Sequence, residues 1–151
     1  MLAISLMSYT LLDCGNFQKF EKIGPYFFVR PSPQAVWSPK SPVSDWVKKA
    51  DAVYERYSEG KGEWKLKNSK MPQSFNIQLN DIEVVMKLTS FGHVGVFFEQ
   101  VRMWAHLDAV IKKAKEQCQD FKVLNLFAYT GGATCSFLKA GAEVLHLDAS
   151  K

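Results

Sequence analysis

Residues 122–148 read KVLNLFAYTGGATCSFLKAGAEVLHLD, and this segment carries the clearest structural signal in the chain. Residues 122–128 form a nearly continuous apolar run, which is typical of a parallel strand buried on both faces. After two glycines, residues 133–140 predict a short helix that ends at Gly141. A second strand is expected at Glu143–Asp148. The pattern therefore predicts the opening strand, helix and parallel strand of an α/β sheet.

The turn between the first strand and the helix indicates a ligand site. Gly131 and Gly132 let the backbone approach a ligand, and the start of the helix offers unpaired amides. Asp148 follows Gly131 by 17 residues, at the end of the second strand. A carboxylate at this place can accept hydrogen bonds from both hydroxyls of an adenosine ribose.

The residues of this turn narrow the ligand class. Phe127 and Tyr129 stand where a G-x-G-x-x-G dinucleotide site needs bare backbone, so a pyrophosphate fits poorly. No Gly-Lys-Ser/Thr follows, which excludes a Walker phosphate loop. An adenosine ligand without phosphates remains. S-adenosylmethionine (SAM) is the commonest such ligand and is the expected cofactor.

The segments NLFAYTGGAT (125–134), GAEV (141–144) and LDASK (147–151) resemble class I SAM-dependent methyltransferases, and more narrowly the bacterial 23S rRNA cytosine-C5 methyltransferases. Asn125, Phe127 and Tyr129 depart from the generic class motif, and the narrower family shares these departures. The resemblance spans nearly the whole chain. Its upstream segments are RPSPQA (30–35), LTSFGHVGVF (88–97) and EQ (99–100).

The resemblance implies a SAM-dependent methyltransferase that acts on RNA, in particular rRNA. By that resemblance residues 127–132 would wrap the methionine part, Asp148 would hold the ribose, and Ala149 would flank the adenine. Gln100 would close the pocket from the opposite side. The implied cofactor contacts are Gln100, Asn125, Phe127, Ala128, Tyr129, Thr130, Gly131, Gly132, Asp148 and Ala149.

No catalytic residue is predicted within the chain. Methylation of cytosine at carbon 5 needs a thiolate nucleophile. In the resembling family this cysteine comes further downstream, so we expect it beyond residue 151. Cys135 is expected to face the interior from its helix and to be unreactive. With two strands of a larger sheet, the chain is expected to hold half a cofactor pocket, to bind SAM weakly and to be inactive alone.

The predicted fold is α/β, with residues 1–90 as a small β-rich domain and residues 91–151 as the first part of a Rossmann-like SAM-binding domain. An amphipathic helix is expected at residues 100–118, whose apolar face includes Cys118. A hairpin is expected around Asn80–Asp81. Other predictions are strands at 9–12, 17–21, 26–29 and 94–98, a helical turn at 44–50 capped by Ser44, and an exposed loop at 58–71.

Composition fits a folded domain outside membranes. The chain has 151 residues, 47% of them hydrophobic, and a net charge of +4, which excludes intrinsic disorder. No apolar run is long enough to span a membrane, and Met1–Leu6 has no features of a secretion signal. Three separate cysteines favour a reducing, cytoplasmic setting. Neither His93 nor His146 has a second potential metal ligand at the spacing that metal sites use.

A second hypothesis is a nucleic-acid-binding module without catalysis of its own. In it, aromatic rings of the first domain stack on splayed bases beside lysines, and the α/β half is a scaffold. The aromatic residues concerned are Tyr26, Phe27, Phe28, Trp37, Trp46 and Trp64.

Overall fold

The computed structural model describes residues 8–58, 61–117 and 120–149 and divides into two compact units. The first unit comprises Met1–Ile77 with Val85–Gly95, and the second comprises Gln78–Val84 with Val96–Lys151. Met1–Leu6, Gly60, Cys118, Ser150 and Lys151, which enter the sequence predictions, lie outside the described residues.

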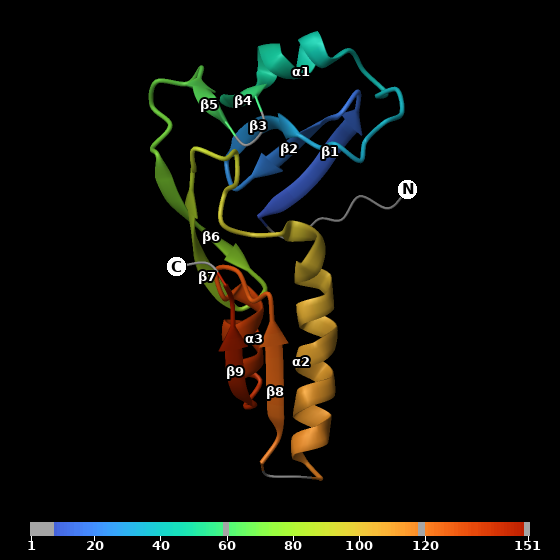
Figure 1. Ribbon diagram of the computed structural model, residues 1–151, viewed down its shortest axis with the longest axis vertical. Helices are drawn as coiled ribbons and strands as arrows, with labels where there is room; N and C mark the ends of the chain where they lie inside the picture. The colour runs from blue at the N-terminus through green and yellow to red at the C-terminus, as the bar shows by residue number, and fades with distance from the viewer. Residues whose placement is uncertain (1–7, 59–60, 118–119, 150–151) are drawn as a thin grey trace. The chain divides into compact units, whose positions relative to one another are not determined.

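The first unit contains a five-stranded mixed sheet, in which the strands lie in chain order (Figure 1). Neighbouring strands are antiparallel, except for one parallel pair that is connected through a short helix. In chain order the elements are β1 (Tyr9–Gly15), β2 (Gln18–Ile23), β3 (Tyr26–Pro31), α1 (Val43–Lys49), β4 (Ala52–Ser58) and β5 (Lys61–Leu66).

Aromatic side chains build the core of this unit. Trp46 of α1 is 1% exposed and stacks on Phe20 of β2, with ring centroids 6.0 Å apart. Phe28 is fully buried. A buried ring cannot stack on a base, so the prediction that Phe28 and Trp46 contact nucleic acid is wrong. These two residues stabilise the fold instead.

The structure corrects two predictions in the first unit. Residues 58–71 are not a plain loop, because β5 pairs with β4 and places Trp64 opposite Tyr54, with ring centroids 5.3 Å apart. Such a cross-strand aromatic pair stabilises a hairpin whose exposed positions carry lysines. Helix α1 begins after Pro42 without a side-chain cap, so Ser44 is not the N-cap.

A further correction concerns residues 94–98, which form no strand. The chain there enters a 3₁₀ turn and then the long helix. The predicted hairpin is confirmed, with Asn80 at a φ of 52°. The remaining elements are β6 (Ser74–Leu79), β7 (Ile82–Lys87), η1 (Phe98–Gln100), α2 (Val101–Lys115), β8 (Lys122–Leu126), α3 (Gly132–Lys139) and β9 (Glu143–Leu147).

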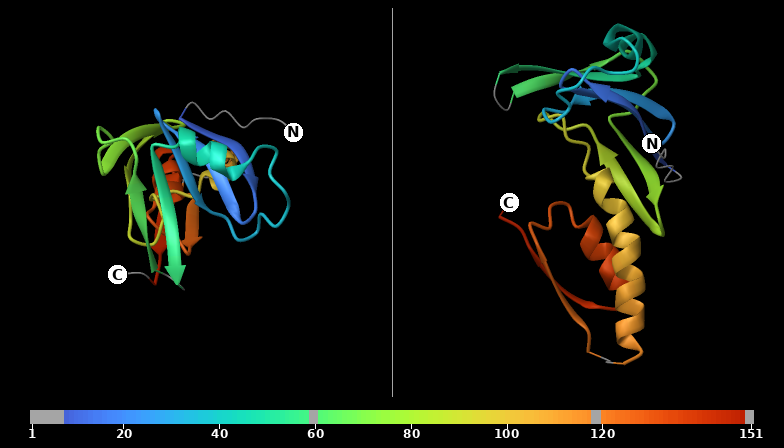
Figure 2. Two further views of the ribbon diagram at one scale, coloured as in Figure 1. Left: turned by 90° about the horizontal axis from the view of Figure 1, so that it is seen from above. Right: turned by 90° about the vertical axis from the view of Figure 1, so that its right-hand side faces the viewer.

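In the second unit, β8 and β9 pair in parallel, with Lys122 opposite Glu143 and Leu126 opposite Leu147. Helix α3 connects them and lies between this small sheet and α2 (Figure 2, right). Ile111 of α2 and Phe137 of α3 are buried in the core between the layers. The sequence pattern at 122–148 therefore predicted this strand, helix and strand correctly.

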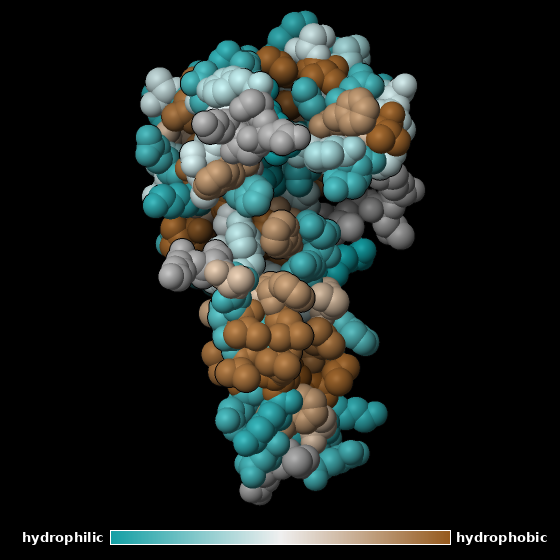
Figure 3. Space-filling view, viewed as in Figure 1, coloured by the Kyte–Doolittle hydropathy of each residue, from teal (hydrophilic) through white to brown (hydrophobic). Residues whose placement is uncertain are grey.

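The other face of the β8–β9 sheet is uncovered by any described element. Its side chains are Leu124, Leu126, Leu145 and Leu147, each between 49% and 66% exposed. Figure 3 shows apolar side chains gathered over these strands. The prediction that β8 is buried on both faces is therefore wrong for the described residues.

None of the helices in the described part of the chain is long and apolar enough to cross a membrane.

Candidate functional site

The chain leaves β8 through a strained bend formed by residues 127–131. Phe127 and Tyr129 both have a φ of 56°, and Gly131 has a φ of 89°. A positive φ costs a residue other than glycine roughly 1–2 kcal/mol. Phe127 is also 90% exposed, so packing of its ring does not explain the conformation. Backbone strain of this kind is concentrated at ligand-binding sites.

Asp148 lies against this bend. Its Oδ2 atom accepts a hydrogen bond from the backbone N–H of Tyr129 at 2.6 Å. The backbone N–H of Ala128 also donates to the carbonyl of Leu147, at 3.1 Å. The end of β9 is thus tied to the bend after β8. The carboxylate points toward the bend, as the ribose-binding hypothesis requires.

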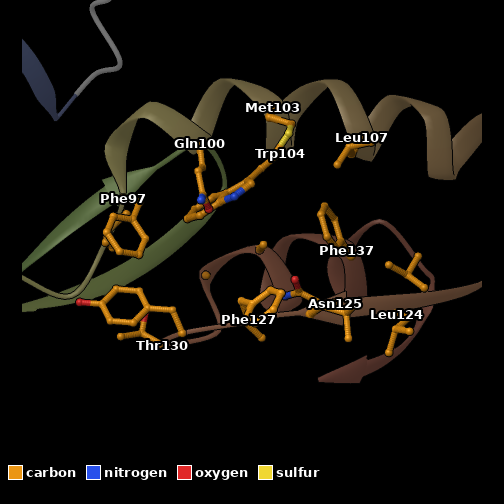
Figure 4. Close-up of a pocket in the computed structure, with 17 residues that line it drawn as sticks. Phe97, Gln100, Met103, Trp104, Leu107, Leu124, Asn125, Phe127, Thr130 and Phe137 are labelled. Carbon is orange, nitrogen blue, oxygen red and sulfur yellow. The ribbon is translucent and has the colours of Figure 1, made fainter. Parts of the chain in front are cut away.

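A cavity of about 500 Å³ opens beside the bend, within the second unit. Figure 4 shows Gln100 of η1 and Trp104 of α2 extending into it, opposite Asn125 and Phe127. The rings of Phe97 and Tyr129 contact each other there, with centroids 4.7 Å apart. Seven predicted cofactor residues line the cavity: Gln100, Asn125, Phe127, Ala128, Tyr129, Thr130 and Gly132. The other three do not line it: Gly131, Asp148 and Ala149.

Trp104 forms part of the cavity wall and was not predicted to do so. It is 3% exposed, and its indole Nε1 has no hydrogen-bond partner among the described residues. A Cβ atom at Gly132 would lie 2.5 Å from Cη2 of this ring, so the indole requires glycine there. The helical period marked Trp104 only as a core residue. A buried donor without a partner is uncommon and suits a ligand site.

A chain of hydrogen bonds lies beneath the bend. Nδ2 of Asn125 donates to Oγ1 of Thr134 at 2.9 Å, and Oγ1 of Thr134 lies 2.9 Å from Nδ1 of His146. Sequence reasoning assigned no role to Thr134 or His146. The sequence feature that could have identified these residues is the alternation of side chains along β8 and β9, which puts positions 125 and 146 on the same face as Val123 and Val144.

Cys135 is exposed, so the prediction that its thiol faces the interior is wrong. The sheet beneath α3 has two described strands, and the helix buries only part of its circumference against them and α2. Among the described residues, no three His, Cys, Asp or Glu side chains gather in a way that could hold a metal ion.

No protein-family model and no curated protein matches the chain. Among solved structures, it is similar to a SAM-dependent methyltransferase from Agrobacterium tumefaciens, at 40% identity over 95% of this chain and with a TM-score of 0.83. A candidate SAM-dependent methyltransferase from Streptococcus mutans is 18% identical over 98% of the chain, with a TM-score of 0.67.

A third structure, SMU.776, a candidate methyltransferase complexed with SAH, is 18% identical over 97% of the chain, with a TM-score of 0.66. The two structures at 18% identity show likeness of fold alone. The chain spans 44% of the Agrobacterium protein and 40% of each of the other two, less than half of their lengths. The solved structures to which the chain is similar are thus described as methyltransferases or candidates for that activity.

Proposed function

We propose that the chain forms the cofactor-binding part of a SAM-dependent methyltransferase. The observation that carries this proposal is the Asp148 carboxylate, held 2.6 Å from the amide of Tyr129 in a strained bend beside a cavity. A carboxylate at the end of a second parallel strand is suited to the hydroxyls of a ribose. The similarity to the Agrobacterium methyltransferase supports the same reading.

The residues around the cavity fit this cofactor. The first turn of α3 has no side-chain cap, and its amides can donate to the carboxylate of the methionine part. The unpaired Nε1 of Trp104 is a further donor in the same wall. The rings of Phe97, Phe127 and Tyr129 present the kind of π-surface that attracts a sulfonium cation. When bound, the cofactor supplies a methyl group activated by the sulfonium, and these residues bind and orient it.

We further propose that the β8–β9 pair opens a Rossmann-like sheet and that the substrate is RNA, specifically an rRNA base in the cytoplasm. The motifs in residues 88–100 and 125–151 support this assignment, because they resemble the rRNA cytosine methyltransferases. The groups that act on the substrate are proposed to come from polypeptide outside residues 1–151. The twofold greater length of the similar methyltransferases supports that assignment.

Calorimetric titration of the whole protein that contains residues 1–151 tests the cofactor. SAM and S-adenosylhomocysteine (SAH) should bind in the micromolar range, whereas ATP and NAD should bind at least tenfold more weakly, because the bend lacks the glycines that admit a pyrophosphate. The absence of SAM and SAH binding at millimolar concentration contradicts the proposal.

A second candidate function, RNA binding by the first unit, has its own observation. Trp37, Tyr57 and Phe91 are each more than half exposed and can stack on bases. Burial lowers the pKa of His93, and so do the nearby cations of the same unit, Arg30, Arg56 and Lys19. Arg30 and Lys19 both pair with the buried carboxylate of Glu21, so Arg56 is the cation of this group that is proposed to contact a polyanion. This function is compatible with methyl transfer, since the unit would then present RNA to the enzyme.

Filter binding to single-stranded RNA over a salt series tests this candidate. Affinity should fall steeply as salt rises. Phe91→Ala should weaken binding by roughly 1–3 kcal/mol through lost stacking, and Arg56→Ala should reduce the salt slope by about 1. Phe28 is buried and carries no such role, so Phe28→Leu is the matched control and should leave RNA affinity unchanged. Affinity that is independent of salt excludes RNA binding by this unit.

A further inference from the structure

We propose that Asn125, Thr134 and His146 form a positioning network that holds the bend in the conformation that binds the cofactor. This inference rests on the proposed function and assigns roles to residues that do not themselves touch the reacting methyl group. Asn125 lies in β8, Thr134 in the first turn of α3, and His146 in β9. The network therefore connects the three elements that meet at the bend.

The distances define a continuous chain. Oγ1 of Thr134 stands 2.9 Å from Nδ2 of Asn125 and 2.9 Å from Nδ1 of His146. Thr134 is 9% exposed, so its hydroxyl has little access to water. Burial makes the loss of such a hydrogen bond more costly than at the surface. Thr134 is the central member, since both neighbours bond to its single oxygen.

The proposal assigns a direction to each bond. Nδ2 of Asn125 donates to Oγ1 of Thr134, and the hydroxyl hydrogen of Thr134 is assigned to Nδ1 of His146. In that arrangement the proton of the imidazole ring lies on Nε2. The network thus selects one tautomer of His146. This gives the proposal a spectroscopic signature that simple packing would not produce.

The His146 ring also supports the bend by contact. A Cβ atom placed on Gly131 would lie 3.4 Å from Cε1 of this ring, so the imidazole packs directly beneath the glycine. At the other end of the bend, Asp148 holds the amide of Tyr129. The bend is therefore held at two points. His146 and Thr134 hold its junction with α3, where the amides proposed to bind the methionine carboxylate begin.

The test compares Thr134→Val with Thr134→Ser in the whole protein. Valine keeps the shape of threonine but removes the hydroxyl, and serine restores it. We expect Thr134→Val to bind SAH about tenfold more weakly, a change of about 1.4 kcal/mol. Thr134→Ser should stay within about threefold of the parent protein. Thr10→Val makes the same chemical change in β1 of the other unit and should leave SAH affinity unchanged.

Asn125→Asp provides an independent variant and readout. A carboxylate at this position accepts a hydrogen bond and cannot donate one, so it competes with His146 for the hydroxyl hydrogen of Thr134. Nitrogen NMR should show the proton of His146 on Nε2 in the parent protein and a shift toward Nδ1 in Asn125→Asp. SAH affinity should fall about tenfold in this variant as well.

The outcomes separate this inference from the proposed function. If the parent protein binds SAH and Thr134→Val binds it equally well, the network is overturned and the cofactor assignment stands. Equal weakening in the serine and valine variants overturns the role of the hydroxyl. An unchanged His146 tautomer in Asn125→Asp overturns the hydrogen-bond order. A parent protein that binds neither SAM nor SAH overturns both proposals.

Discussion

Replacement of Asp148 by alanine should weaken the binding of SAH to the whole protein by about 100-fold. Hydrogen bonds to a charged group contribute about 1.5–3 kcal/mol each, and a loss of 2.7 kcal/mol corresponds to about two decades in affinity. A carboxylate can accept several hydrogen bonds, so its bond to Tyr129 is compatible with bonds to a ribose. Calorimetric titration with SAH measures the change.

The same carboxylate supports the bend, and a second variant separates the two roles. Asp148→Ala removes the acceptor of the Tyr129 amide and should lower the free energy of unfolding by about 1–3 kcal/mol. Asp148→Asn keeps an oxygen acceptor and should unfold close to the parent protein, yet bind SAH at least tenfold more weakly. Asp120→Ala, at an exposed carboxylate of the same unit, is the control and should change neither quantity. Parent-like SAH affinity in Asp148→Ala refutes the ribose-binding role.

The parts of the site that the sequence predicted are those with a periodic signal. The apolar run of β8, the glycines and the spacing to Asp148 specify a strand, helix and strand, and the structure has them in parallel register. The Asn80–Asp81 turn was equally predictable, since Asn tolerates a positive φ. In each case the local chemistry and the tertiary arrangement require the same conformation.

The parts that could not be predicted depend on contacts between distant residues. Phe127 and Tyr129 adopt positive φ values that their residue types disfavour, so only the surrounding structure specifies them. Trp104 has the spacing of a core residue, and its unpaired Nε1 becomes evident only beside Gly132. The β4–β5 hairpin was missed because the four lysines of residues 58–71 obscure its alternation, while the Tyr54–Trp64 pair that stabilises it crosses two strands.

The uncovered face of the β8–β9 sheet leads to a prediction about the whole protein. Four exposed leucines on two paired strands form an apolar surface of the kind that soluble proteins cover. The chain spans 44% of the similar Agrobacterium methyltransferase. We propose that further polypeptide of the whole protein covers this face. The surface would then be part of a core, and replacement of its leucines would destabilise the whole protein much more than the chain of residues 1–151.

The double variant Leu145→Thr with Leu147→Thr tests this assignment. In the whole protein it should lower the free energy of unfolding by about 3–5 kcal/mol, because each buried leucine contributes about 1.5–3 kcal/mol. In a chain of residues 1–151 alone it should change that free energy by less than about 1 kcal/mol, since both side chains are more than half exposed there. It should also reduce self-association of this chain in sedimentation experiments, because threonine retains β-propensity while lowering the apolar area.

Leu12→Thr is the matched control, because Leu12 is an exposed leucine of β1 in the other unit. Its effect on unfolding should be below about 1 kcal/mol in both polypeptides. Denaturant titration of the parent, the double variant and the control in both polypeptides gives the six free energies that the comparison needs. A loss below 1 kcal/mol for the double variant in the whole protein would mean that Leu145 and Leu147 remain exposed there. That outcome would contradict the proposal that further polypeptide of the same protein covers this face.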